Sequence, residues 1–162
     1  MEKRKHIYII IIIILLLLLT GAIVYIISTQ SDNSQQLSKD ENAVEWNGEQ
    51  RTPRLPNGQK GIAIPGFESL VFIANQRNQK VNFFNPPEND CLFRMTLYVE
   101  DEALWQSGYC AAGKGYYDIE LSKPLAAGDY SASLKIECFK SDGTTLNGAK
   151  VELKLMVQED NS

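Results

Sequence analysis

Histidine is nearly absent from this 162-residue chain, whose single example is His6, ahead of a long apolar run. The residues after that run have no imidazole to activate a serine or cysteine nucleophile, and none for the usual zinc sites. Cysteine is also scarce, with three residues whose spacing matches no metal-binding pattern. These absences argue against a hydrolase or a zinc enzyme. We therefore expect no catalytic, cofactor-binding or metal-binding residues.

Two acidic clusters and one glycine-rich stretch are the remaining candidates for chemistry. The acidic clusters, 88–90 and 100–102, fall where predicted strands end. Paired carboxylates can serve acid/base catalysis or bind calcium, but neither cluster has the spacing of a calcium loop. We interpret both as solvated turns. The stretch Gly113-Lys114-Gly115 lacks the other residues of a phosphate-binding loop.

The longest apolar run is 7–27, which holds 21 consecutive residues without charge. As a helix it would be about 32 Å long, enough to cross a bilayer. Secretory signals usually have a shorter apolar stretch and a small-residue cleavage site. The nearest such site, Thr20-Gly21-Ala22, is followed by more apolar residues. We predict a retained transmembrane helix over 7–27, with cleavage after Ala22 as the alternative.

Charge on either side of the run predicts its orientation. The stub 1–6 carries Lys3, Arg4 and Lys5 against Glu2, and positive flanks stay in the cytoplasm. The C-terminal part is then extracytoplasmic, and the protein is a single-pass protein of the cell membrane. Of the 16 bases and 20 acids in the chain, 13 bases and 19 acids follow the stub. That excess of negative charge disfavours nucleic acid as a partner.

The segment 28–60 is rich in Ser, Gln, Asn and Asp and shows no apolar periodicity. Such a composition is typical of a flexible linker. Trp46, beside Ala43 and Val44, is the one apolar spot. It either docks on the domain that follows or lies at the membrane interface, and we interpret it as a local hydrophobic contact without function.

Short runs of alternating apolar and polar residues occupy 61–158, followed by the polar tail 159–162. This alternation, with turn residues between the runs, predicts an all-β fold. The length, about 100 residues, is typical of an immunoglobulin-like antiparallel β-sandwich. We expect seven or eight strands: a hairpin of 130–138 and 149–157, a strand at 91–99, shorter strands at 70–73, 80–84, 103–106 and 115–121, and a possible edge piece at 62–64.

The three cysteines follow this predicted strand pattern. If consecutive strands alternate in direction, Cys91, Cys110 and Cys138 lie at the same end of the domain, with Cys110 in a loop. Cys91 and Cys138 share a face with inward-pointing residues, which favours them as a pair. The pair is either a disulfide, which the extracytoplasmic side permits, or two buried thiols that pack as small hydrophobic groups.

Several stretches, IAIPGF, FNPPENDCLF, LWQSG, PLAAGDY and ECF followed by LNGA, resemble an uncharacterised family of small Gram-positive bacterial membrane proteins. The resemblance covers about 60–158. It implies one N-terminal helix, a polar linker and a compact β-sandwich, and it brings no catalytic or binding residues.

Taken together, these features predict a non-enzymatic, membrane-anchored module that binds another protein or an envelope component. The alternative is a structural accessory subunit of a membrane or secretion assembly, in which the apolar helix pairs with other helices. The sequence identifies neither the ligand nor the face that binds it.

Overall fold

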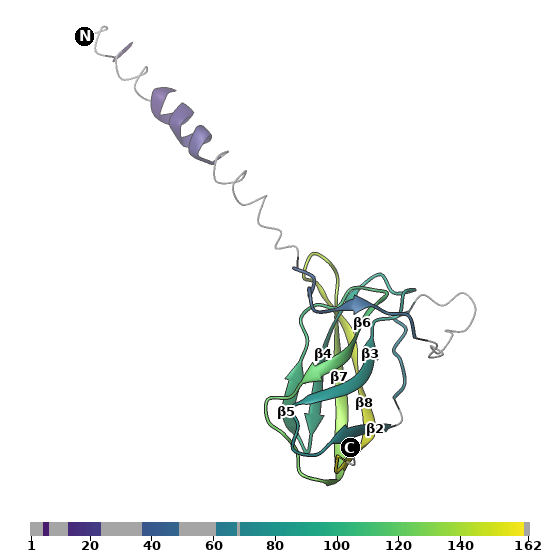
Figure 1. Ribbon diagram of the computed structural model, residues 1–162. Coiled ribbons are helices and arrows are strands. Elements are labelled where there is room, and N and C mark those ends of the chain that lie inside the picture. Colours follow the sequence, from purple (N-terminus) through teal and green to yellow (C-terminus); the bar gives the residue numbers. More distant parts are fainter. Residues whose placement is uncertain (1–4, 7–12, 24–36, 49–60, 68, 161–162) are drawn as a thin grey trace. The chain divides into compact units, whose positions relative to one another are not determined.

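The computed structural model describes residues 5–6, 13–23, 37–48, 61–67 and 69–160 (Figure 1). Residues 13–23 are helical and belong to the predicted transmembrane segment. Within the described ranges, no helix has the length and apolar character needed to cross a bilayer. The other parts of that segment, 7–12 and 24–27, lie outside the described residues, so the transmembrane helix stays a prediction. The chain divides into two compact units, Met1–Gln35 and Gln36–Ser162.

The second unit consists of two β-sheets, in agreement with the all-β prediction. One sheet has five strands in the order β2-β8-β7-β4-β5, and the other has three in the order β1-β6-β3. The strands are β1 (Val44–Glu45), β2 (Ser69–Ile73), β3 (Asn78–Phe84), β4 (Leu92–Val99), β5 (Glu102–Gln106), β6 (Lys114–Glu120), β7 (Gly128–Phe139) and β8 (Thr145–Gln158).

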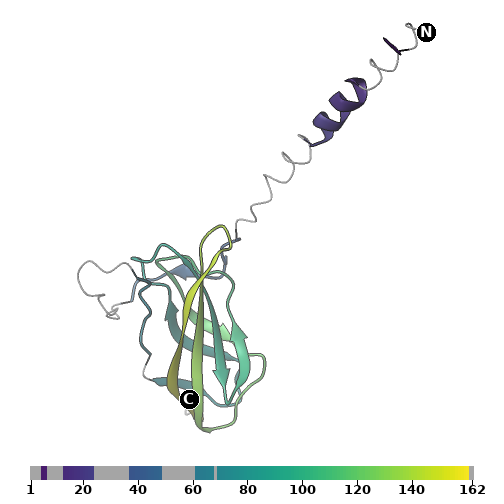
Figure 2. The same ribbon diagram turned by 180° about the vertical axis from the view of Figure 1, so that it is seen from behind.

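Neighbouring strands are antiparallel except β2 and β8, which run parallel. The β7–β8 hairpin runs the length of the domain (Figure 1 and Figure 2). The β4–β5 hairpin turns at Glu100 and Asp101, which both have positive φ. Two successive residues of positive φ match the twist of a tight hairpin. The chain passes between the sheets from β2 to β3, β3 to β4, β5 to β6 and β6 to β7.

The core lies between the two sheets because alternate residues of the facing strands point inward. Phe83 of β3, Phe93 and Leu97 of β4 and Leu134 of β7 are fully buried there. The long predicted strands show this pattern most clearly, and the structure confirms the strands predicted between 70 and 157 with shifts of a few residues at their ends.

The predicted edge strand at 62–64 is wrong. Residues 61–67 form no strand. The Asn89 side chain holds this segment instead, accepting a hydrogen bond from the Ala63 amide at 2.8 Å and donating one to the Ala63 carbonyl at 2.9 Å. A side-chain amide thus takes the place of a neighbouring strand, which a period-two pattern cannot reveal.

The linker prediction is wrong for residues 37–48, which pack on the domain. β1 pairs with Gly115 and Lys114 of β6, and Trp46 stacks on Phe84 with ring centroids 3.9 Å apart. Phe84 lies on the outer side of β3 yet is fully buried, because Trp46 and Phe67 cover it. The stacking of Trp46 therefore holds this segment on the domain, although its polar composition is typical of a linker. The rest of the predicted linker, 28–36 and 49–60, lies outside the described residues.

Candidate binding site between β5 and β6

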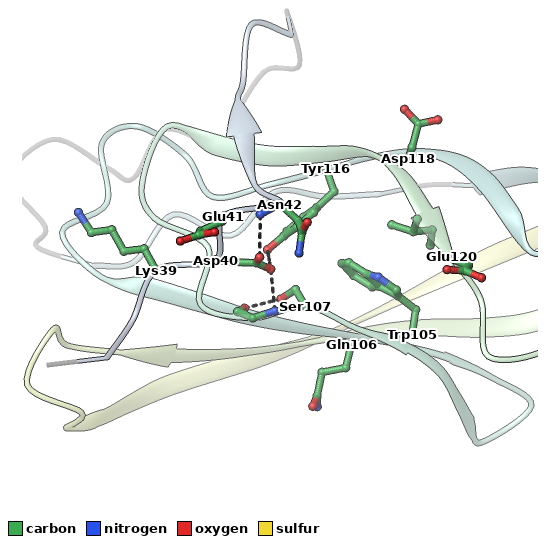
Figure 3. A pocket seen from close by; sticks show the side chains of 12 residues that line it. Lys39, Asp40, Glu41, Asn42, Trp105, Gln106, Ser107, Tyr116, Asp118 and Glu120 are labelled. Atoms are coloured by element: carbon green, nitrogen blue, oxygen red, sulfur yellow. Dashed lines mark hydrogen bonds between the residues drawn. The ribbon is translucent and has the colours of Figure 1, made fainter. Parts of the chain in front are cut away.

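A cavity of about 680 Å³ opens between β5, β6 and the segment that precedes β1 (Figure 3). Trp105 of β5 and Ile119 of β6 contribute apolar lining, while Asp40, Ser107, Asp118 and Glu120 contribute polar lining. A concave site with an aromatic wall and a few placed polar groups is the usual form of a binding site.

One edge of β6 is open along this cavity. β1 is only two residues long and pairs with Gly115 and Lys114 alone. On the side of β6 away from β3, the positions 116–120 therefore pair with no strand in the described part of the chain. Unpaired backbone groups on a strand edge are a template for another strand.

The Asp40 carboxylate explains why the segment that precedes β1 does not pair with β6. Its Oδ2 atom accepts hydrogen bonds from the Gly108 amide at 2.9 Å and from the Tyr116 hydroxyl at 2.7 Å. Its Oδ1 atom accepts one from the Asn42 amide at 2.9 Å. The Asp40 amide also donates to the Tyr109 carbonyl at 2.9 Å. These contacts hold the segment before β1 against residues 108 and 109, which follow β5. The segment therefore cannot continue the pairing of β1 along β6.

The same contacts set the ionisation of Asp40 and Tyr116. Burial raises the pKa of Asp40, but the hydrogen bonds from Tyr116, Asn42 and Gly108 together lower it below its ordinary value of 3.8. Burial, and next the hydrogen bond to Asp40, raise the pKa of Tyr116. At neutral pH the pair is a carboxylate and a neutral phenol. Both oxygens of the charged Asp40 carboxylate thus already accept hydrogen bonds, which suits a structural role better than proton transfer. We call Asp40 with these hydrogen bonds the latch.

Aromatic rings form the inner wall. Trp105 contacts Tyr116 edge to face with centroids 5.1 Å apart, and its ring lies 5.8 Å from that of Phe83. Trp105 is half-buried, whereas Tyr116 and Phe83 are buried. Figure 3 shows the Asp40 carboxylate between Tyr116 and Ser107, with Trp105 beside them. Trp105 therefore offers a ligand an apolar surface that the fold already holds in place.

The rim of the cavity is acidic. Asp40, Glu41, Asp118 and Glu120 line the cavity, and among the described residues Lys39 is the only cationic one that lines it. Asp118 forms an ion pair with Lys80, and Glu120 forms one with Arg77 at 3.2 Å. The side chains of Asp118 and Glu120 stay 64% and 62% exposed. Each can therefore still receive a cation from a ligand.

The structure brings the predicted pair Cys91 and Cys138 together, outside this cavity. Both are buried free thiols, and their side chains interact. That contact, with burial, raises the pKa of Cys138. The two alternatives expected from the sequence, a disulfide and a pair of packed thiols, both stay predictions. Cys110 is fully buried too, and its Sγ donates to the Lys114 carbonyl at 3.3 Å; burial raises its pKa to about 12.

The acidic clusters lie in turns. Glu100 and Asp101 form the β4–β5 turn, and Glu88 and Asp90 are exposed in the β3–β4 connection. Asn89 is instead buried, where it donates to the Asn85 side chain at 2.8 Å. Among the described residues, no three His, Cys, Asp or Glu side chains are grouped to hold a metal ion.

Sequence reasoning missed the residues that build the cavity. Asp40 lies in the segment interpreted as a linker, and its partners Gly108 and Tyr116 are 68 and 76 positions away. Trp46, named as the one apolar spot of that segment, was the available signal that the segment docks. No local pattern points to Asp40 itself, because a lone aspartate in polar sequence is ordinary.

Comparisons with protein-family models, curated proteins and solved structures found no match. The resemblance to Gram-positive membrane proteins therefore stays a prediction.

Proposed function

We propose that this protein is a non-enzymatic binding module, anchored in the membrane by residues 7–27, whose extracytoplasmic domain recognises a partner at the cavity between β5 and β6. The observation that carries the proposal is the form of this cavity. Its apolar wall is preformed, its rim is acidic, and its central carboxylate is held by three donors. Such a site is organised for recognition, because the buried polar groups have their partners already.

The proposal includes an immunoglobulin-like sandwich as the fold of the domain. If β2 is counted as the first strand, β4 is the third, β7 the sixth and β8 the last. These three strands are neighbours in one sheet. The fifth and second strands, β6 and β3, are neighbours in the other. Immunoglobulin-like sandwiches have these neighbours. This strand order supports the proposal, together with the length of about 100 residues.

The anchor and its orientation rest on the sequence. The run of 21 uncharged residues has the length of a bilayer span, and the bases Lys3, Arg4 and Lys5 precede it. Protease added to wall-stripped cells should remove a tag placed at the C-terminus of the full chain. Survival of the tag in intact cells, with loss after lysis, would contradict the proposed orientation.

Recognition at the cavity is tested by proximity labelling from the C-terminus of the full chain. We compare the wild type with the double variant Asp118→Lys, Glu120→Lys on the cavity rim. The matched control is Glu152→Lys on β8, since Glu152 is also an exposed strand carboxylate paired with a lysine, Lys150. The rim variant should lose specific neighbours that the control keeps. Identical neighbours in all three chains would contradict a role for the cavity.

A helix exchange separates this proposal from an accessory role in a membrane assembly. Replacing 7–27 by an unrelated apolar segment of equal length should leave the labelled neighbours unchanged, because recognition lies in the domain. Loss of those neighbours from a chain that still reaches the membrane and keeps a folded domain would favour the accessory role.

A further inference from the structure

We propose that the cavity accepts an extended polypeptide strand, which adds to the open edge of β6 and carries basic side chains alternating with apolar ones. This inference rests on the proposed function, since it names the class of partner for the same site. Three features of the site support it: the free edge, the two kinds of side chain along β6, and the charge of the rim.

The free edge has the length that a bound strand needs. Positions 116–120 span about 17 Å at roughly 3.4 Å per residue, which is enough for a ladder with a five-residue peptide. β1 pairs antiparallel with the preceding part of β6, at Gly115 and Lys114. A peptide in the same direction would lie in line with β1. Main-chain hydrogen bonds would supply affinity, as in other cases of strand addition.

Side chains along β6 predict the pattern of the peptide. Tyr116 and Ile119 are both buried although they are three positions apart, because the pairing of β6 with β3 shifts register between Asp118 and Tyr116. Regular alternation applies over 118–120, where Ile119 is buried and Asp118 and Glu120 are exposed. Figure 3 shows Asp118 projecting away from the Asp40 side chain. Successive side chains of an added strand point to opposite faces of the sheet. One set would meet Trp105 and Ile119, and the other would meet Asp118 and Glu120. Apolar residues suit the first set and lysine or arginine the second.

Charge also argues against a second copy of this chain as the occupant. Two β6 edges brought together would place Asp118 and Glu120 of one chain near those of the other. Like charges directly across a strand pair are destabilising. A basic strand instead brings cations beside Asp118 and Glu120, whose ion pairs with Lys80 and Arg77 leave their side chains 64% and 62% exposed. Acidic residues on an open edge thus disfavour self-pairing and favour a cationic partner.

The test measures binding of synthetic seven-residue peptides to the full chain in detergent micelles by fluorescence anisotropy. The first peptide alternates valine and lysine, the second has the same composition with the lysines in one block, and the third alternates valine and glutamate. We expect saturable binding of the first, at least about tenfold weaker binding of the second, and none of the third. Asp118→Lys, Glu120→Lys should weaken binding of the first by about tenfold or more, and Glu152→Lys should leave it unchanged.

Backbone methylation distinguishes strand pairing from simple charge attraction. Two versions of the first peptide carry N-methyl groups at odd or at even positions, with all side chains kept. A strand uses only one of its edges against β6, so one version should lose binding and the other should keep it. Equal binding of both versions would overturn the inference, and so would equal binding of the alternating and block peptides.

Two further results separate the inference from the proposed function. If no peptide binds but the labelled neighbours still depend on Asp118 and Glu120, strand addition is wrong and the binding module stands. If the neighbours do not depend on these residues either, both fail. Cross-linking of two full chains through their β6 edges, undisturbed by the alternating peptide, would identify a second copy as the occupant and overturn the inference.

Discussion

On the side of the domain formed by β2 and β3, the buried side chain of Gln79 closes the gap between the sheets. Its Oε1 atom accepts from the Ile73 amide at 2.9 Å, and its Nε2 atom donates to the Ile73 and Gln76 carbonyls at 2.8 Å. On the side formed by β5 and β6, the Asp40 carboxylate holds the chain away from β6, and the cavity remains between the strands.

The difference between the two sides indicates where the domain is open to a partner. A side-chain amide can replace a strand at a sheet margin, as Gln79 does for Ile73. Nothing comparable pairs with positions 116–120 of β6 among the described strands. Open edges invite aggregation, and proteins usually cover or charge them. Here Asp118 and Glu120 charge the edge, which protects it against aggregation.

The largest expected loss of stability comes from a substitution on the closed side, formed by β2 and β3. Gln79→Leu leaves the amide and carbonyl of Ile73 without their side-chain partner in a buried place, so the free energy of unfolding should fall by about 3 kcal/mol. Gln76→Leu is the control, because Gln76 is exposed and should change stability by less than about 0.5 kcal/mol. Chemical denaturation of the full chain in detergent measures both. Equal effects would mean that Gln79 does not seal this side.

Removing the aromatic that docks the segment before the cavity comes next. Trp46→Ala loses the stack on Phe84 and the hydrogen bond from Nε1 to Asn82 at 3.0 Å. Because Trp46 is only partly buried, the expected loss is about 2 kcal/mol. Val44→Ala, at an exposed position of β1, should cost less than about 0.5 kcal/mol. If Trp46→Ala is equally mild, residues 37–48 are not part of the folded domain.

The latch on the open side gives a smaller effect that depends on pH. Asp40→Asn removes a charged acceptor from Gly108 and Tyr116, and we expect a loss of about 1.5 kcal/mol at pH 7 after allowance for partial exposure. The folded state lowers the pKa of Asp40. Its contribution is therefore present above the ordinary aspartate pKa of about 4 and is lost as the pH falls through the lowered value.

The difference in unfolding free energy between wild type and Asp40→Asn should accordingly shrink when the pH is lowered from 7 to 3. Glu41→Gln, on the adjacent exposed carboxylate, should leave stability at pH 7 within about 0.5 kcal/mol of the wild type. If the difference in unfolding free energy between wild type and Asp40→Asn is constant over this pH range, the charge of the carboxylate does not stabilise these contacts.

The smallest expected effect concerns the space beneath the latch. A Cβ at Gly108 would lie 2.9 Å from Oδ2 of Asp40 and 3.0 Å from its Cγ, whereas a Cβ at Gly66 would have nothing within 4 Å. Gly108→Ala should therefore cost about 1 kcal/mol, and Gly66→Ala less than about 0.5 kcal/mol. Because Asp40→Ala removes Oδ2 and Cγ but keeps the Cβ that also lies 3.0 Å away, the cost of Gly108→Ala should be smaller in that background. An equal cost of Gly108→Ala in the wild type and in Asp40→Ala would contradict a contact between the new methyl group and the Asp40 side chain.

The strands of the domain could be predicted because their signal is local. In β7 and β8, inward apolar residues alternate with outward polar ones over many positions, and a period of two identifies a strand regardless of its neighbours. The proximity of Cys91 and Cys138 followed from strand direction and face. The bounds of β2 to β8 therefore agree with the sequence to within a few residues, apart from longer starts of β7 and β8.

The cavity could not be predicted because its signal is long-range. Asp40 meets Tyr116 only once β6 is in place, and β1 has too few residues to show alternation. Likewise, 62–64 looked like a strand because three alternating residues fit many structures, while Asn89 decides its conformation. Side chains that substitute for strands, Asn89 and Gln79, carry no pattern in sequence. The open and closed sides are set by such contacts.

Residue-resolved hydrogen exchange of the ligand-free full chain tests the open edge most directly. The amides of β6 between 116 and 120 that do not face β3 should exchange at least about 100-fold faster than those of β7, which has a partner strand on each side. The amide of Ile73, held by Gln79, should exchange slowly although β2 is also an edge strand. Slow exchange throughout 116–120 would contradict the account, because that edge would already be occupied.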